Sequence, residues 1–93
     1  MSETNVELER VRSEIERIDR ALLDLIAERV RLARQTGAAK RASGLPILDP
    51  AREVFVVRRA GTLAREVGVA EEEVRGIFWH LVGLSRRAQM EEP

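Results

Sequence analysis

Residues 8–32 read LERVRSEIERIDRALLDLIAERVRL, and this stretch decides the fold of the chain. Its apolar side chains recur at alternating steps of three and four, which predicts one buried stripe along an α-helix. We call this stripe the seam, and it consists of Leu8, Val11, Ile15, Ile18, Leu22, Leu25 and Leu32. Arg29 interrupts the seam. Because a buried guanidinium keeps its charge, we expect Arg29 to meet an anion, either a protein carboxylate or a bound ligand.

The helical pattern around the seam extends from about Thr4 to Ala42. Gly37 is its only glycine, and residues 43–46, with the sequence SGLP, end it. A helix of this length would measure roughly 55 to 60 Å, more than the diameter of a compact domain of this size. Such a helix cannot bury its seam alone.

Two shorter helices follow. Asp49 and Pro50 predict an N-cap and a first helical residue, and the second helix runs to about Glu66 before Gly68. A third helix begins near Ala70, with three glutamates in its first turn. The apolar faces that we predict are Val56, Val57, Ala60, Leu63, Ala64 and Val67 in the second helix, and Val74, Ile77, Phe78, Leu81, Val82 and Leu84 in the third.

These shorter helices can cover only part of the seam, so we expect a second copy of the chain to cover the rest. The predicted fold is all-α, with one very long and two shorter helices per chain in an intertwined homodimer. Residues 1–93 are expected to form one helical domain.

Composition narrows the function further. A net charge of zero disfavours nucleic acid and membrane surfaces as partners. The chain has no cysteine and one histidine, which excludes thiol chemistry and disfavours a metal site. The polar N-terminus is followed by no apolar run typical of a signal peptide or membrane span, so we expect a cytoplasmic protein.

Lys40 lies eleven residues after Arg29, within about 20° of the same helical direction. Two cations on one buried face suggest a polyanionic ligand. The alternative is an internal ion pair at Arg29 and an exposed lysine near the helix end.

Polar side chains also continue the apolar face of the third helix. Ser85 and Gln89 lie four residues apart there, and they either bind a ligand or mark where the helix leaves the core. Arg86 and Arg87, beside them, look like solvated positions.

The first turn of the second helix contains Asp49, Arg52 and Glu53. Capping and the helix dipole give both acids a structural role, but either could also accept a hydrogen bond from a ligand hydroxyl. Arg12 alone looks like a surface arginine, about 25 Å along the helix from Arg29. In an antiparallel dimer, however, Arg12 of one chain could approach Arg29 of the other.

Taken in order, these residues resemble the all-helical chorismate mutases, and the similarity extends from about Leu8 to Gln89. The matching segments are Val11-Arg12, the run IDRALLDLIAER at 18–29, Lys40, DPARE at 49–53, Ser85 and Gln89. The resemblance implies a free-standing homodimeric isomerase of the phenylalanine and tyrosine branch of aromatic amino-acid biosynthesis. Such an enzyme converts chorismate to prephenate without a cofactor or a metal.

The resemblance also implies the role of each site residue. Lys40 and Gln89 would face the ether oxygen, where negative charge grows as the carbon–oxygen bond breaks. The substrate-binding residues would be Arg29 and the partner chain's Arg12 at the two carboxylates, Ser85 beside them, Asp49 and Glu53 at the ring hydroxyl, and Arg52 in support.

Three alternatives stay open. A mutase for 4-amino-4-deoxychorismate would act on a substrate that differs at the group contacted by Asp49 and Glu53. An isochorismate-pyruvate lyase shares the fold, but its relatives lack the full Asp-x-x-Arg-Glu pattern. A non-catalytic dimerisation or regulatory module would keep only the helical scaffold.

Overall fold

The computed structural model describes residues 3–91, and in this range the chain forms three helices and no strand. They are α1 (Glu3–Ala42), α2 (Pro50–Glu66) and α3 (Glu71–Gln89). The predicted class, one long helix and two shorter ones, is confirmed. No helix in this range has the length and apolar character needed to cross a membrane.

The helix ends follow local sequence chemistry. Asp49 caps α2, because its carboxylate accepts a hydrogen bond from the backbone N–H of Arg52 at 3.1 Å. Ala70, before α3, provides no side-chain cap. Gly44 and Gly68 follow α1 and α2 with φ values of 70° and 74°, a conformation that glycine adopts without steric cost.

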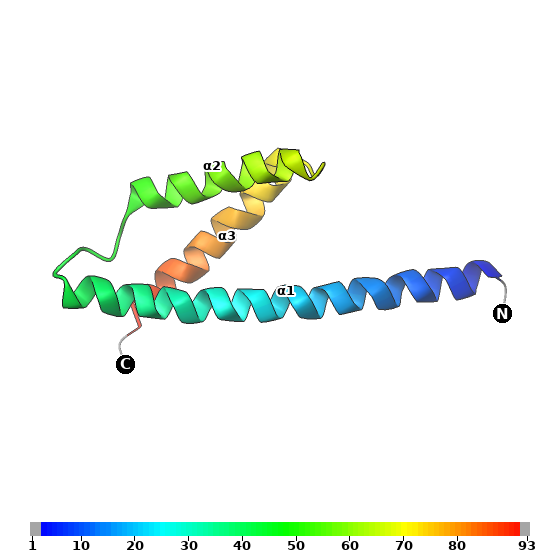
Figure 1. Ribbon diagram of the computed structural model, residues 1–93, viewed down its shortest axis with the longest axis horizontal. Coiled ribbons are helices and arrows are strands. Elements are labelled where there is room, and N and C mark those ends of the chain that lie inside the picture. Colours follow the sequence, from blue (N-terminus) through cyan, green and yellow to red (C-terminus); the bar gives the residue numbers. More distant parts are fainter. Residues whose placement is uncertain (1–2, 92–93) are drawn as a thin grey trace.

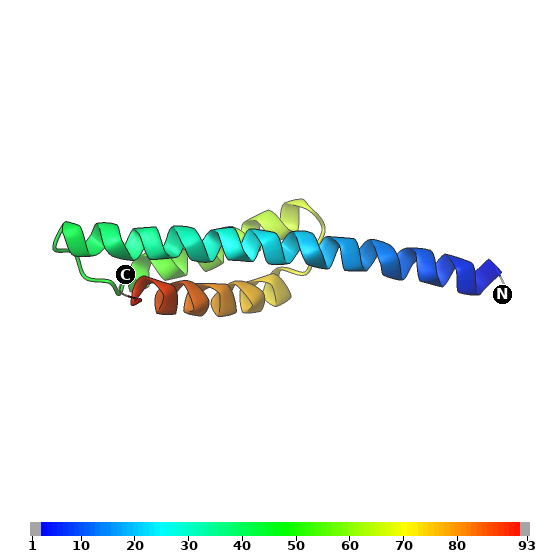
Figure 2. The ribbon, with the colours of Figure 1, turned by 90° about the horizontal axis from the view of Figure 1, so that it is seen from below.

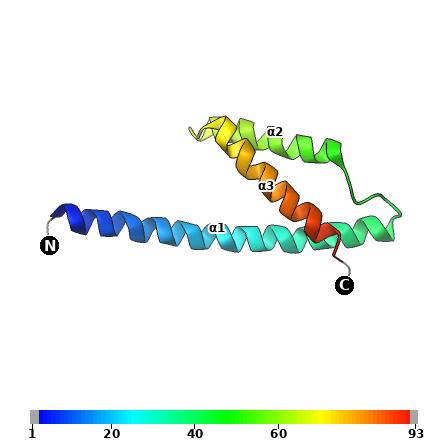
Figure 3. The same cartoon turned by 180° about the vertical axis from the view of Figure 1, so that it is seen from behind.

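The three helices are arranged as an open wedge (Figure 1). α2 packs on α3, and α3 packs on α1, whereas α1 and α2 do not pack against each other within residues 3–91. The view from behind shows α3 crossing obliquely, with its C-terminal end against α1 (Figure 3). The N-terminal part of α1 extends beyond both shorter helices (Figure 2).

The C-terminal end of α3 approaches α1 closely at Gly37. A Cβ atom there would lie 2.8 Å from the Gln89 Cα and closer still to its carbonyl oxygen, so only glycine fits. Arg41 donates a hydrogen bond to the Gln89 carbonyl oxygen at 2.8 Å. Arg34 forms an ion pair with Glu91. This end of α3 is therefore fixed on α1 at several points.

α3 covers a different face of α1 from the seam. The shielded α1 residues are Ile26, Val30, Ala33 and Gly37, and at 100° per residue they point on average about 70° away from the seam. The seam residues stay 39% to 62% exposed. Our expectation that the shorter helices cover part of the seam is therefore wrong. Ala33 and Gly37 allow the closer approach, so α3 packs on their side.

The interior of the wedge contains small side chains. The buried apolar residues are Ala33, Val57, Ala60, Ala64, Val82 and Ala88, and no large side chain within residues 3–91 is fully buried. The predicted apolar faces are therefore only partly correct, because Leu63, Val67 and Ile77 are 42%, 73% and 58% exposed. The radius of gyration is 17.6 Å. A compact chain of this length would have about 12 Å.

Candidate active site

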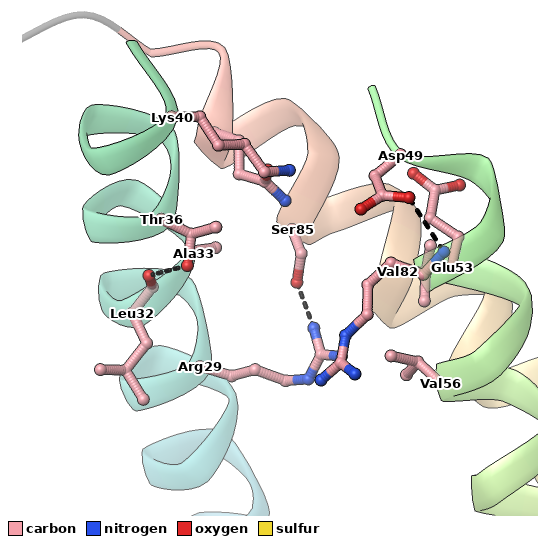
Figure 4. Close-up of a pocket in the computed structure, with 12 residues that line it drawn as sticks. Arg29, Leu32, Ala33, Thr36, Lys40, Asp49, Glu53, Val56, Val82 and Ser85 are labelled. Atoms are coloured by element: carbon pink, nitrogen blue, oxygen red, sulfur yellow. Dashed lines mark hydrogen bonds between the residues drawn. The ribbon is translucent and has the colours of Figure 1, made fainter. Parts of the chain in front are cut away.

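A pocket of about 540 Å³ lies between the three helices, within the range typical of small-molecule sites. Figure 4 shows side chains from all three helices converging on it. The lining residues are Arg29, Leu32, Ala33, Thr36 and Lys40 of α1, Asp49, Arg52, Glu53 and Val56 around the start of α2, and Val82, Ser85 and Gln89 of α3. Every site residue predicted from the sequence lines this pocket except Arg12.

Arg29 enters the pocket from the line of the seam, about 70° from the centre of the face that α3 covers. Its guanidinium donates a hydrogen bond to the Ser85 hydroxyl (Figure 4). It also donates to the Leu81 carbonyl oxygen at 3.4 Å. Within residues 3–91 no carboxylate pairs with it. The internal ion pair that we considered is therefore not found in this part of the chain, and the Arg29 charge is available to a ligand.

Lys40 and Gln89 form a second polar contact in the pocket. The Lys40 ammonium donates to the Gln89 Oε1 at 2.7 Å and to the Ile47 carbonyl oxygen at 2.8 Å. Because lysine is only a donor, the Gln89 amide must turn its oxygen toward Lys40. Its amide N–H groups therefore remain to donate elsewhere. Lys40 is half-buried, so the alternative of an exposed lysine is wrong.

Glu53 is held by an arginine from α3. The Arg86 Nε and Nη2 atoms donate to the two Glu53 carboxylate oxygens at 2.9 and 2.6 Å. This hydrogen bonding holds the pKa of Glu53 below its usual range, against the opposing effect of burial. The expectation that Arg86 is a solvated position is wrong. The partners are 33 residues apart, and no local pattern in the sequence indicates their contact.

The last two arginines lie in different surroundings. The Arg52 guanidinium stacks over the Phe55 ring, 4.8 Å from its centroid, and no ion pair holds it within residues 3–91. Arg12 lies on the part of α1 that extends beyond the other helices. Its side chain is 62% exposed and 3.6 Å from Glu9. Arg12 is therefore outside the pocket of its own chain.

The charges of this site favour a ligand with two negative charges. With Arg86 included, the four cations Arg29, Lys40, Arg52 and Arg86 face the two carboxylates of Asp49 and Glu53. Residues 3–91 contain no group of three or more side chains that could hold a metal ion.

The fold and the pocket together define an all-helical domain with a small-molecule pocket lined by cations and carboxylates. The family model for chorismate mutase type II matches residues 11–90. The chain therefore belongs to the type II chorismate mutase family, whose members are isomerases, and the resemblance predicted from its sequence is confirmed.

The relatives differ in length. A chorismate mutase of Methanocaldococcus jannaschii is 37% identical over 82 residues, which span 88% of this chain and 83% of that protein. A 4-amino-4-deoxychorismate mutase of Streptomyces venezuelae is 35% identical, over 84% of this chain and 75% of its own length. The T-protein of Haemophilus influenzae is 34% identical over 76% of this chain, but the match spans only 19% of the T-protein.

A solved structure shares the fold. It is a conserved hypothetical protein from Pyrococcus furiosus with a TM-score of 0.75 and 34% sequence identity. The match covers 96% of this chain and 99% of that one. The long helix and the two shorter helices therefore recur in a relative of almost the same length.

Proposed function

We propose that the chain binds chorismate in this pocket and rearranges it to prephenate. The observation that carries the proposal is the unpaired positive charge of Arg29, Lys40 and Arg52 beside two carboxylates. Chorismate matches this arrangement, because it has two carboxylates, a ring hydroxyl and an enolpyruvyl ether. In the reaction the ether carbon–oxygen bond breaks while a carbon–carbon bond forms between the enolpyruvyl methylene and the ring. No proton or electron passes to the protein.

Arg29 and Ser85 bind one substrate carboxylate in this proposal. Ser85 already accepts a hydrogen bond from Arg29, so its own O–H is free to donate to the ligand. The planar guanidinium suits two-point binding of a carboxylate. Holding both carboxylates forces the flexible enolpyruvyl arm over the ring, and such positioning can supply up to about 7 to 11 kcal/mol of the barrier.

Lys40 and Gln89 stabilise the transition state at the ether oxygen. Negative charge grows on this oxygen as the bond breaks, so the two donors bind the transition state more strongly than the substrate. Their mutual hydrogen bond of 2.7 Å holds both side chains at one end of the pocket before the substrate arrives. Removing one such donor typically costs about 3 to 4 kcal/mol of activation free energy.

Asp49 and Glu53 accept the hydrogen bond of the ring hydroxyl. The Asp49 carboxylate uses one oxygen to cap α2 and has its other oxygen available. Glu53 keeps a free lone pair on each oxygen while Arg86 binds it from one side. Arg52 supports this subsite from the first turn of α2.

A second copy of the chain completes the site in this proposal. The accessible surface is 7303 Å², whereas a compact monomer of 10.5 kDa would expose about 5,400 Å². The excess is about 1,900 Å² per chain, so a homodimer that buried it would have an interface of roughly 3,800 Å², a size typical of obligate dimers. The exposed seam provides the apolar surface for this interface. Arg12 projects from the same extended half of α1 and would reach the partner's pocket.

A mixing experiment tests the shared site. Arg12→Ala and Arg29→Ala should each be inactive alone, because each removes one arginine from both sites of a dimer. After the two variants are unfolded and refolded together, random pairing leaves about a quarter of the sites intact, and activity should return to that level. A control mixture of Arg29→Ala with Lys40→Ala should stay inactive, because both residues come from the same chain of each site. If both mixtures stay inactive, Arg12 does not act across the dimer.

Product analysis tests the reaction. The purified chain is incubated separately with chorismate, isochorismate and 4-amino-4-deoxychorismate, and the products are identified. We expect prephenate from chorismate. Pyruvate released from isochorismate would instead indicate a lyase, and turnover of the amino analogue alone would indicate the activity named for the Streptomyces relative. A chain that converts none of them while remaining folded would be a non-catalytic module.

We further propose that residues 1–93 act as one domain in the cytoplasm. The single wedge of helices, the lack of cysteine and the water-soluble substrate support this proposal.

A further inference from the structure

Arg86 is the charged residue of this region that the proposed mechanism does not use. It does not line the pocket, but its guanidinium binds both oxygens of Glu53, which does. The Arg86 side chain is 36% exposed and that of Glu53 is 21% exposed. The pair joins α2 to α3, so the direction of the Glu53 carboxylate depends on the packing of these two helices.

We propose that Arg86 is a positioning residue, which fixes the Glu53 carboxylate toward the ring substituent and makes this subsite prefer a neutral hydroxyl to an ammonium group. This inference rests on the proposed function. Two-point binding fixes the plane of the carboxylate, and the remaining lone pairs accept a hydrogen bond from the ligand. The positive charge of Arg86 compensates the negative charge of Glu53, so a cationic substituent gains little there.

The surrounding charges are three cations and one further carboxylate, so their balance acts in the same direction. Glu53 faces Arg86 of α3, Lys40 of α1 and Asp49 before α2. Lys40 and Arg86 lower the pKa of Glu53, while Asp49 raises it. Arg52 adds a cation in the same turn of α2. A hydroxyl group donates a hydrogen bond to the Glu53 carboxylate without bringing a charge into the subsite. An ammonium group is repelled by the three nearby cations, and Arg86 offsets the attraction of Glu53 for it.

The test compares kcat/KM for chorismate and for 4-amino-4-deoxychorismate in four proteins: wild type, Arg86→Gln, Arg86→Lys and Arg87→Gln. Arg87→Gln is the matched control, because it removes the same charge from the adjacent position of α3, where no ion pair is found within residues 3–91. We expect the wild type and the control to prefer chorismate. Arg86→Gln should lose roughly tenfold or more in kcat/KM for chorismate. The ratio of its kcat/KM values for chorismate and the amino analogue should also fall, because the negative charge of Glu53 then has no paired arginine.

The lysine variant separates positioning from charge. Arg86→Lys keeps the cation and the balance of charge that the fold needs, but it binds Glu53 at one point instead of two. We expect its kcat/KM for chorismate to stay nearly as low as that of Arg86→Gln. If Arg86→Lys had the wild-type kcat/KM for chorismate, the positioning role would be overturned.

The acid limb of the pH profile provides a readout that a purely structural role would not change. When Arg86 is replaced by glutamine, the pKa of Glu53 rises toward its ordinary value, and the acid limb of kcat/KM for chorismate should move to higher pH. The limb of Arg87→Gln should stay in place. Equal profiles and preferences for the two glutamine variants, in an active wild type, would overturn this inference alone, whereas a wild type inactive on both substrates would overturn the proposed function.

Discussion

Gly37→Ala should disable the site although Gly37 itself does not line the pocket. The added methyl group would lie 2.8 Å from the Gln89 Cα and 2.9 Å from its carbonyl carbon. Carbon atoms in ordinary contact are about 3.5 to 4.0 Å apart, so the end of α3 must move away from α1 by about 1 Å. Both neighbours are backbone atoms, and a rotamer change cannot relieve the overlap.

A shift of this size acts directly on the pair that faces the ether oxygen. The Lys40 to Gln89 hydrogen bond is 2.7 Å long and the Arg41 to Gln89 bond is 2.8 Å long, so an added 1 Å would break both. A displacement of about 1 Å in a catalytic group can cost about 100-fold in rate. We expect a loss of that order in kcat, with a smaller change in KM because Arg29 still binds a carboxylate.

The effect on stability should be smaller. Overpacking typically costs about 1 to 3 kcal/mol, and the higher helix propensity of alanine offsets about 1 kcal/mol of this cost. We therefore expect the free energy of unfolding to fall by roughly 0 to 2 kcal/mol, as measured by urea denaturation.

Gly76→Ala is the matched control. It makes the same substitution inside a helix, but nothing lies within 4 Å of the added methyl group. This variant should keep wild-type turnover and gain stability from helix propensity. If Gly37→Ala also kept wild-type turnover of chorismate, the close approach of α3 to α1 would not position Lys40 and Gln89, and our reasoning would be refuted.

Four further outcomes are expected. Arg29→Ala should lower kcat/KM by about 100-fold to 1,000-fold while circular dichroism and the sedimentation coefficient stay unchanged, and wild-type turnover would exclude Arg29 from the site. Leu22→Glu, which places a charge on the exposed seam, should shift the protein to monomers in sedimentation experiments, and an intact dimer would show that the interface lies elsewhere. Turnover by the wild type should stay flat from pH 6 to pH 8, because the Gln89 amide donates without titrating, whereas Gln89→Glu should be active only where its carboxyl group is protonated. The lowered pKa of Glu53 stabilises the folded protein fully above the unfolded-state pKa of about 4.3, and this stabilisation is lost as the pH falls through the folded-state pKa. The difference in melting temperature between wild type and Arg86→Gln should therefore shrink below about pH 4. A constant difference down to pH 2 would contradict this last expectation.

Local sequence patterns determined much of this protein. The helix bounds follow from the period of the apolar residues, from Asp49 and Pro50, and from the two glycines that end α1 and α2, because caps and turns act over a few residues. Four pocket residues, Arg29, Lys40, Ser85 and Gln89, were also predictable as polar side chains on apolar faces. A single charged residue on an otherwise apolar helical face, such as Arg29, indicates a binding site or an ion pair, because a buried charge needs a partner.

Contacts between distant residues were decided only by the tertiary structure. The sequence predicts the seam, but α3 packs about 70° away from it, because Ala33 and Gly37 allow a closer approach than leucines do. Glu53 pairs with Arg86, which is 33 residues away. The chain contains many other arginines, and charge alone does not indicate which of them binds Glu53. Periodicity tells which side of a helix is apolar, whereas steric fit decides which neighbour covers it. That fit leaves the seam of α1 exposed, and it directs the charge of Arg29 from the seam into the pocket.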